Sequence, residues 1–337
     1  MAVDLSLSDE QAAVQQAFAE FFARESPIRV VREAEPVGFS PDLWKRLADL
    51  GASAMGLPGS GADSLTLCLV AEELGRRLAP VPLIEALVAV DLLASLDAAS
   101  LLRPLTEGAD IATLALDSPY AGRLRLVPAG AVARTVLALD GSDLVSLQRT
   151  APPGHEPNFG CSPLADWPLA DARLSTLASG PRAADLHQAG RALWKLLMSA
   201  ALNGIQASAL EIAVAYVKSR EAFGRQIGWF QAVQHRLADV AVAGDGARYL
   251  TYEAAWARDG GAAADADRLA SMAFLFSAET SFFTCREALQ FHGGYGYALE
   301  YDIQLYFRRA KAWPLALGDP RSELLRVAKL TYPAQES

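Results

Sequence analysis

The richest run of residues that could do chemistry lies at 216–239. It contains the guanidinium of Arg220, a Phe-Gly turn at Phe223, and Gln231. The pattern predicts a helix that ends at Arg220 and a second helix that begins near Phe230. A helix N-terminus offers free backbone amides, and beside a guanidinium these amides suit a pyrophosphate. The same run is typical of an interhelical loop whose polar side chains only cap or meet solvent, so spacing alone leaves both interpretations open.

A second motif, Gln-Phe-His-Gly-Gly-Tyr-Gly-Tyr, occupies residues 290–297. Its glycines include Gly293 and Gly294, which allow the backbone to approach a ligand closely. The alternative is a helix C-cap in which Gly293 is left-handed. His292 either contacts an adenine or is a satisfied loop histidine. A helix rather than a strand precedes the glycines, so this is not the dinucleotide-binding Gly-x-Gly-x-x-Gly fingerprint.

Composition excludes several classes of protein. The chain has 337 residues, 52% of them hydrophobic, which excludes intrinsic disorder. Its net charge of −9 argues against nucleic acid as a partner. The 3 cysteines and 4 histidines lack the spacing of a disulfide framework or a zinc site, so no metal is expected. We read no membrane span and no secretory signal, and we expect a cytoplasmic protein with no membrane partner.

Hydrophobic periodicity gives the order helices, short strands, helices. We predict a mainly α fold with a small β insert, divided into an N-terminal helical domain (1–106), a truncated middle β domain (107–176) and a C-terminal helical bundle (177–337). Helices are expected at 9–25, 41–50, 64–78, 82–96, 183–218, 229–258, 263–291, 301–313 and 321–329, strands at 112–116, 123–127, 135–139 and 143–147, and turns at 140–141 and 259–262. Ser8 and Gln11 fit a capping box. Trp44, Trp256 and Phe276 are expected in the core.

Taken together, these motifs resemble the acyl-CoA dehydrogenase family over nearly the whole chain. The segments that carry the resemblance are Leu5-Ser-Leu-Ser-Asp-Glu-Gln11, Trp44-Lys-Arg-Leu-Ala-Asp-Leu-Gly51, Gly56-Leu-Pro58, Ala71-Glu-Glu-Leu-Gly-Arg76, Arg220-x-x-Phe-Gly with Phe230-Gln231, and Gln290-x-x-Gly-Gly. The resemblance implies that family's fold: an N-terminal helical domain, a middle β domain and a C-terminal four-helix bundle.

The resemblance also implies a cofactor, FAD, bound along a subunit interface. The cofactor-binding residues it indicates are Arg220, Phe223, Gln231, Gln290, Gly293 and Gly294. In the family, such groups come from one subunit and hold the diphosphate and adenosine tail of an FAD whose flavin ring lies mainly in the neighbouring subunit. The flavin accepts a hydride from the β-carbon of a CoA thioester while a carboxylate removes the α-proton.

The catalytic carboxylate of the family is absent from its expected positions. The usual glutamate position falls on Leu317, and the alternative position on the long upstream helix falls on Trp194. Neither side chain can accept a proton, so no catalytic residue is assigned. Asp319 lies nearby, but its side chain is short and displaced by two positions, and a helix N-cap is its simpler role. A basic cluster at 308–311 could meet a CoA phosphate or simply lie at a helix C-terminus.

The middle region departs from the family as well. Residues 117–122 resemble a flavin-binding loop only faintly, and several following strands are missing. The chain therefore resembles the short, base-less subunits of heteromeric bacterial acyl-CoA dehydrogenases. Such subunits pair with a full-length, glutamate-bearing partner in heterotetramers, and they often act on CoA thioesters of steroid or bile-acid side chains. An electron-transfer flavoprotein is the expected electron acceptor.

Two alternatives remain open at this level. The chain could be an independently active, homomeric acyl-CoA dehydrogenase with an atypical base. It could also be a binding or scaffold protein that has lost flavin. Expression of the chain alone, with a visible spectrum and a CoA-thioester assay, separates the three hypotheses.

Overall fold

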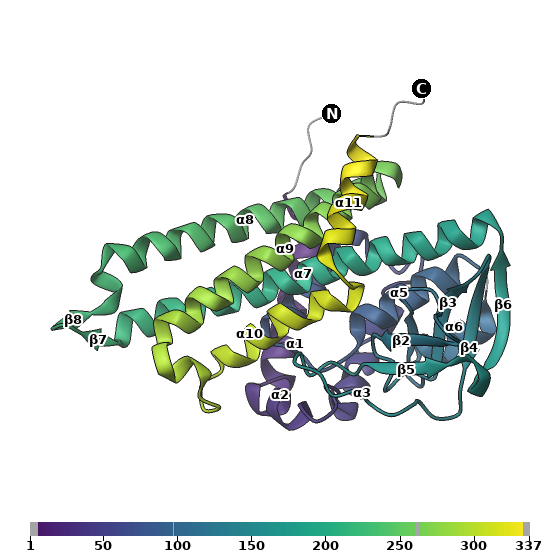
Figure 1. Cartoon of the computed structure of the whole chain (residues 1–337), viewed down its shortest axis with the longest axis horizontal. Coiled ribbons are helices and arrows are strands. Elements are labelled where there is room, and N and C mark those ends of the chain that lie inside the picture. The colour runs from purple at the N-terminus through teal and green to yellow at the C-terminus, as the bar shows by residue number, and fades with distance from the viewer. Residues whose placement is uncertain (1–5, 97, 261–262, 333–337) are drawn as a thin grey trace.

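The computed structural model describes residues 6–96, 98–260 and 263–332. Along this part of the chain, helices come first, short strands follow and long helices return (Figure 1). The fold is mainly α with a small β insert, as the sequence predicts. The predicted turn at 259–262 falls partly outside the described residues.

The N-terminal helices pack into the core through their apolar faces. They are α1 (Asp9–Glu25), α2 (Ile28–Ala34), α3 (Pro41–Asp49), the 3-10 turn η1 (Ala52–Ala54), α4 (Ser64–Arg76), α5 (Leu83–Ala94) and α6 (Ala99–Thr106). The predicted capping box is confirmed, because the Gln11 amide donates to the Ser8 hydroxyl and the Gln11 side chain accepts from the Ser8 amide. Helices α2 and α6 were not predicted separately, since 7 and 8 residues give too few turns for a clear period.

The strands form two small sheets. They are β1 (Ala112–Leu114), β2 (Arg123–Val127), β3 (Thr135–Asp140), β4 (Asp143–Gln148), β5 (Ala165–Pro168) and β6 (Arg173–Ser179), with a 3-10 turn η2 (Leu169–Asp171) before β6. One sheet has the order β1-β3-β4-β6, and β2 pairs with β5. Asp140 pairs with Asp143, which confirms the predicted hairpin turn. The sequence analysis missed β5 and β6.

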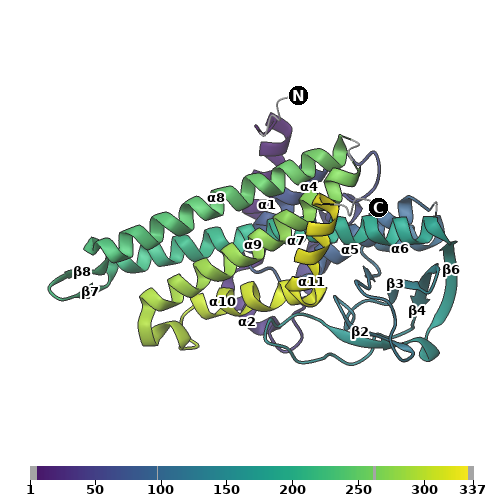
Figure 2. The ribbon, with the colours of Figure 1, turned by 45° about the horizontal axis from the view of Figure 1, so that its top comes forward.

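The C-terminal half is built around three long helices. Its elements are α7 (Pro181–Ser219), the hairpin β7 (Glu221–Ala222) and β8 (Arg225–Gln226), η3 (Ile227–Trp229), α8 (Gln231–Asp259), α9 (Ala263–His292), η4 (Gly293–Tyr297), α10 (Ile303–Ala312), η5 (Trp313–Leu317) and α11 (Pro320–Thr331). Figure 2 shows that the strands lie at one end of α7 and the β7–β8 hairpin at the other.

Two glycines bring the N-terminal helices against the bundle. A Cβ at Gly75 of α4 would lie 1.9 Å from the carbonyl oxygen of Ala201 on α7. A Cβ at Gly204 of α7 would lie 2.0 Å from the carbonyl oxygen of Glu72. The two helices therefore meet backbone to backbone, and only glycine fits at either position. This contact makes one continuous hydrophobic core of both helical parts.

Of the three residues expected in the core, only Trp44 is confirmed there. Trp44 is buried and Trp256 is half-buried, but the Phe276 side chain is 40% exposed. It lies on the outer surface of α9, where its ring crosses Gly246 of α8. An apolar side chain on a long helix therefore packs over a glycine without entering the core.

Helix α7 is also long and apolar enough to cross a membrane by length and composition alone. In the structure, 72% of its apolar window is buried by other parts of the protein. That is the environment of a core helix, and no membrane span is indicated among the described residues.

Candidate functional site

The first sequence motif forms the tip of the bundle. Helix α7 ends as predicted, with Arg220 as its C-cap, and a tight β7–β8 hairpin follows. Phe223 and Gly224 form the turn with positive φ angles of 54° and 78°. Phe223 is 93% exposed, and its ring lies edge-on to that of Phe230 at a centroid distance of 6.2 Å. A left-handed, exposed phenylalanine is a costly arrangement for this chain alone.

Two polar side chains of this motif, those of Arg220 and Gln231, form no hydrogen bond or ion pair with the described residues. The Arg220 guanidinium lies 5.8 Å from the centre of the Tyr295 ring. Gln231 opens α8, whose N-cap residue Phe230 provides no side-chain hydrogen bond. Among the described residues, no hydrogen bond or ion pair engages the side chain of Arg220 or Gln231. Both remain available to an external anion.

The second motif ends α9. Gly293 adopts a φ of +59°, the left-handed conformation of the C-cap alternative, and the chain continues as η4. A Cβ at Gly293 or Gly294 would meet no atom within 4 Å, whereas one at Gly296 would lie 2.7 Å from the Leu289 carbonyl oxygen. Packing within the chain therefore requires a glycine at position 296. At Gly294, the space that a side chain would occupy is free.

The fold brings the two motifs together. The rings of Tyr216 on α7 and His292 on α9 stack with centroids 3.9 Å apart. His292 is buried, its Nδ1 lies 2.7 Å from the Ala288 carbonyl oxygen, and burial lowers its pKa. Of the two roles considered for His292, the satisfied loop histidine is therefore confirmed. The stacked pair fixes the distance between Arg220 and the glycine loop.

A groove of about 490 Å³ lies beside this loop. It is lined by Phe282, Arg286, Leu289, Gln290, Gly293, Gly294, Tyr297 and Phe307. Gln290 is exposed, and its side chain forms no hydrogen bond with the described residues. We call the groove lined by these eight residues the tail groove. Gln290, Gly293 and Gly294 were singled out from the sequence, whereas Arg286 was not, because it stands outside the glycine motif.

The chain's sequence matches characterised proteins along nearly its whole length. The profile of the acyl-CoA dehydrogenase N-terminal domain matches residues 8–96, and that of the C-terminal domain matches residues 170–330. Acyl-CoA dehydrogenase IpdE2 of Mycolicibacterium smegmatis is 32% identical over 329 residues, which cover 95% of this chain and 98% of that protein. The chain belongs to the acyl-CoA dehydrogenase family. Members of this family are oxidoreductases that act on the CH–CH bond of acyl-CoA thioesters and bind FAD.

Other relatives and solved structures are also similar to this chain over nearly its whole length. Benzylmalonyl-CoA dehydrogenase of Aromatoleum aromaticum is 27% identical over 379 residues, covering 96% of this chain and 98% of that protein. A chain of the Tcur3481-Tcur3483 steroid ACAD superposes with a TM-score of 0.86 at 26% identity, over 97% of this chain and 98% of that one. A chain of the ChsE4-ChsE5 complex from Mycobacterium tuberculosis has a TM-score of 0.87 at 24% identity, over 98% and 100% of the two chains.

The sequence analysis expects the family's catalytic carboxylate at the position of Leu317 or of Trp194. Leu317 ends η5 and packs half-buried against the core. Trp194 is 1% exposed and lies with its ring centre 5.9 Å from that of Phe274. Both positions are filled by apolar packing, as the sequence indicates.

The space near these positions is small. A cavity of about 70 Å³ lies between α5, α7, η5 and the loops around Pro128 and Cys161, with Trp194, Trp313 and Ala316 in its wall. This junction cavity has room for a few water molecules and not for an acyl chain. Glu85 is the only carboxyl group among the described residues that line it. The sequence analysis missed Glu85, because nothing local relates it to Trp194, which lies 109 positions away and donates its indole N–H to Glu85 over 3.4 Å.

Asp319, the other candidate base, is a helix cap. Its carboxylate accepts the backbone N–H of Arg321 at 2.9 Å and begins α11. The Arg321 side chain and amide hold the pKa of Asp319 below its usual value. A weakly basic carboxylate tied to its own helix is a poor proton acceptor, and the capping role is confirmed.

The basic residues near the end of α10 take separate roles. Arg308 forms an ion pair with Glu35, and Arg309 is 2% exposed and lies 3.5 Å from the same carboxylate. These two residues tie α10 to the segment after α2. Lys311 is exposed, with its ammonium group 4.9 Å from the centre of the Phe282 ring. Only Lys311 remains open to a ligand.

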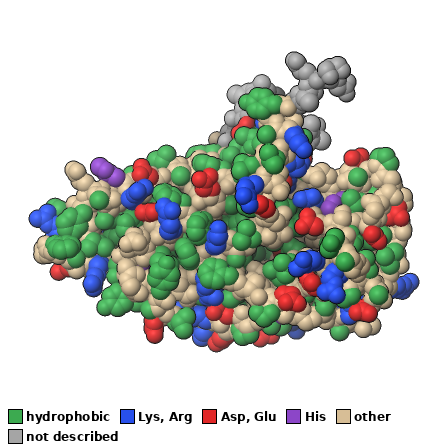
Figure 3. All heavy atoms as spheres, in the orientation of Figure 1, with side chains coloured by type: hydrophobic (Ala, Val, Ile, Leu, Met, Phe, Trp, Pro, Cys, Tyr) green, Lys and Arg blue, Asp and Glu red, His purple; other side chains and the backbone are tan. Residues whose placement is uncertain are grey.

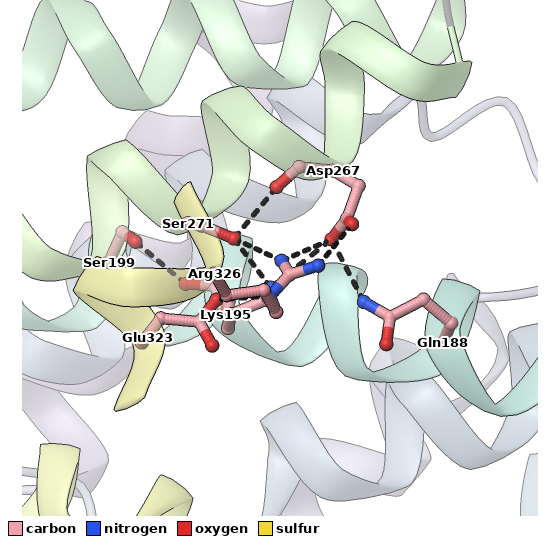
Figure 4. A network of polar contacts seen from close by, with 7 residues as sticks. All are labelled: Gln188, Lys195, Ser199, Asp267, Ser271, Glu323 and Arg326. Carbon is pink, nitrogen blue, oxygen red and sulfur yellow. Dashed lines mark hydrogen bonds and ion pairs between the residues drawn. The ribbon is translucent and has the colours of Figure 1, made fainter. Parts of the chain in front are cut away.

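A buried ionic network fixes the segment that carries Leu317. Lys195 of α7, which is 1% exposed, lies 2.8 Å from Glu323 of α11 and 3.2 Å from Asp267 of α9 (Figure 4). Arg326 of α11 contacts Asp267 through both terminal nitrogens, at 2.6 and 2.8 Å. Two cations balance two carboxylates, and Ser271 adds a hydroxyl. The network anchors α11, and with it the preceding η5, against the bundle.

Proposed function

We propose that this chain is the base-less subunit of a heteromeric acyl-CoA dehydrogenase and that it completes the FAD site of a full-length partner subunit. One contrast carries the proposal. The tail groove is open at about 490 Å³, while the junction cavity is reduced to about 70 Å³ and both base positions hold apolar side chains. In this proposal the chain retains residues that can hold the diphosphate and adenosine part of FAD, and it lacks the carboxylate that removes the α-proton.

The residues at the bundle tip suit the FAD tail. Arg220 and the first turn of α8 at Gln231 present positive potential to the diphosphate. The open faces of Gly293 and Gly294 allow close backbone approach, and Gln290 offers a free amide. Phe223 supplies an exposed ring at the subunit boundary. When bound, FAD supplies the hydride acceptor, and in our proposal the partner supplies both the flavin-ring pocket and the glutamate.

The relatives support this assignment of substrate and partner. The Tcur3481-Tcur3483 steroid ACAD and the ChsE4-ChsE5 complex are each named for two different gene products. We place the substrate among CoA thioesters of steroid or bile-acid side chains, with an electron-transfer flavoprotein as acceptor and the cytoplasm as the location. A wide substrate would use the room that a short middle region leaves.

The test is expression of the chain alone and with a full-length homologue that carries the glutamate. The pair should hold FAD and oxidise acyl-CoA thioesters in the presence of an artificial electron acceptor, and the chain alone should be colourless and inactive. Replacing the partner's glutamate with glutamine should remove activity from the pair, because a positioned base contributes about 10²–10⁴-fold in rate. Strong turnover by the chain alone would refute the proposal, and a colourless, stable homomer with no affinity for any homologue would favour the scaffold alternative.

Glu85 favours a second candidate function, an independently active dehydrogenase. Its carboxylate accepts the indole N–H of Trp194, the alternative base position, over 3.4 Å. Burial, however, raises the pKa of Glu85, which opposes the ionised form that a base requires. In this alternative a Glu85→Gln homomer would lose its activity, while in the partner-subunit proposal the same change would leave turnover by the pair intact.

A further inference from the structure

Helix α11 has its polar and apolar faces reversed relative to an ordinary surface helix. All residues of α11 are described, and only Glu323 among them is buried, where Arg326 joins it in the ionic network. The large apolar side chains lie on the solvent side. Leu324, Leu325 and the C-cap residue Tyr332 are 56%, 65% and 79% exposed. A surface helix normally buries its apolar stripe and exposes its charges, so the ionic network holds α11 with an apolar face turned to solvent.

These exposed side chains form one ridge. Positions 324, 328 and 332 are four residues apart and therefore lie in line along the helix, with Leu325 beside them. Ala328 is exposed as well. We call Leu324, Leu325, Ala328 and Tyr332 the α11 ridge. Figure 3 shows hydrophobic side chains together with Lys and Arg side chains where Figure 1 places the end of α11. The ridge is thus open to another molecule.

A groove of about 450 Å³ adjoins the ridge. It lies between α7, α8, α9 and α11, with Leu330 of α11 among its lining residues. Alanines make up five of the eleven lining residues, namely Ala189, Ala192, Ala254, Ala266 and Ala270. Because alanine projects only a methyl group from a helix, these positions leave a recess that larger side chains would fill. We call this recess the alanine groove.

Opposite charges border the ridge and the groove. Lys329 is exposed on α11, and Asp185 of α7 is an exposed lining residue of the groove. Within the described part of the chain, neither side chain forms an ion pair or a hydrogen bond. The other charged residues of the groove are already paired, since Arg258 lies 2.8 Å from Asp91 and Asp267 belongs to the ionic network. A free cation beside the ridge and a free carboxylate in the groove are therefore complementary.

We propose that two copies of this chain associate about a two-fold axis, with the α11 ridge of each copy in the alanine groove of the other and Lys329 of each next to Asp185 of the other. A two-fold interface requires one surface to carry both halves of the contact. Here α11 and the adjoining groove provide an apolar projection, an apolar recess, a cation and an anion. Ridges of side chains packed into grooves are also the usual form of a helix–helix contact.

The inference goes beyond the proposed function, because it concerns the contact of this chain with a second copy of itself. It makes no use of the bundle tip or of the cofactor. In a heteromeric enzyme, the same contact would join two heterodimers through their base-less subunits.

The experiment measures self-association of the full chain by sedimentation velocity over a range of concentrations, both alone and as the pair with the full-length homologue. Leu325→Glu places a charge on the ridge. Leu174→Glu is the matched control, since Leu174 on β6 is also exposed, at 46%. Lys329→Glu and Asp185→Lys each bring like charges together, whereas the double variant restores opposite charges at both contacts. Circular dichroism checks that each variant is folded.

We expect the wild-type chain to form a dimer and the pair to form a two-plus-two assembly. Leu325→Glu should raise the Kd of the dimer about tenfold or more, because a charge would enter an apolar contact, and Leu174→Glu should leave this Kd unchanged. Each single charge reversal should raise the Kd about two- to fivefold at low salt. The double variant should recover most of that loss.

A wild-type chain that stays monomeric, with a pair that stays one-to-one, would overturn the inference. A double variant no stronger than the single variants would do the same. If Leu325→Glu left self-association intact but prevented binding of the homologue, the ridge would belong to the partner subunit and the inference would be wrong. A two-plus-two pair without FAD would refute the proposed function and leave this interface standing.

Discussion

The bundle tip and the junction cavity share helix α7 and have opposite character. On α7, Arg220 is exposed and unpaired at the tip, while Trp194 is buried against Phe274 of α9. These positions are 26 residues apart, which is about 39 Å of helix. Because the two regions share no side chains, one can be filled while the other stays open. In our proposal, the cofactor-holding half of a flavoenzyme is retained in this way without its catalytic half.

The largest effect is expected at the junction cavity. Trp194→Ala should lower the free energy of unfolding by about 3–5 kcal/mol, because it removes a fully buried indole and leaves a cavity. FAD affinity of the complex should not change, since the tip lies far along α7. Denaturant unfolding and flavin titration measure the two quantities. If Trp194→Ala kept its stability and lost FAD, the junction cavity and the bundle tip would not be independent.

Next in size is the ionic network behind Leu317. Lys195→Met should cost about 3 kcal/mol of stability, because Glu323 and Asp267 lose a buried cation and keep only Arg326. Thermal unfolding checks this result. Arg321→Met is the control on the same helix, since Arg321 is 86% exposed and should be nearly neutral. Equal effects of the two changes would mean that the network does not anchor α11.

At the bundle tip, Arg220→Ala should weaken FAD binding and leave the fold unchanged. Removal of a charge-assisted contact with the diphosphate should cost about 1.5–3 kcal/mol of FAD affinity in the complex. Circular dichroism should show unchanged helix content, because no ion pair or hydrogen bond within the described residues depends on the guanidinium. Unchanged flavin occupancy would remove Arg220 from the site.

Substitutions at two neighbouring glycines distinguish an effect on FAD binding from an effect on stability. Gly296→Ala should destabilise the chain by about 1–3 kcal/mol through its clash with the Leu289 carbonyl, with a secondary effect on FAD. Gly294→Ala should leave the unfolding free energy unchanged and weaken FAD binding, since only a ligand occupies the space in front of it. The reverse pattern, measured by unfolding and flavin titration, would make the tail groove purely structural.

The smallest effect is expected at Asp319. Asparagine caps helices about as well as aspartate, so Asp319→Asn should change stability by less than about 0.5 kcal/mol. Turnover by the complex should also remain, because Asp319 serves its own helix. A large loss of turnover would identify Asp319 as a base and would refute the partner-subunit proposal.

Local patterns predicted what depends on neighbours in sequence. The capping box at Ser8, the Phe-Gly turn and the left-handed Gly293 are set by residues within one or two turns, and all are confirmed. Strand β5 was missed because Ala165–Pro168 is short and ends in proline. Glu85, Arg286 and Lys311 could not be found this way, since their significance comes from contacts across α5, α7, α9 and α10. The size of the junction cavity likewise follows only from packing.

The exposed rings at the bundle tip bear on how much of this protein a cell should make. Phe223, Trp229 and Tyr297 are each at least 66% exposed. A copy without a partner would present these side chains to every other protein around it and would be prone to aggregation and proteolysis. We therefore expect the two chains to be synthesised in matched amounts, with any surplus of this one rapidly degraded.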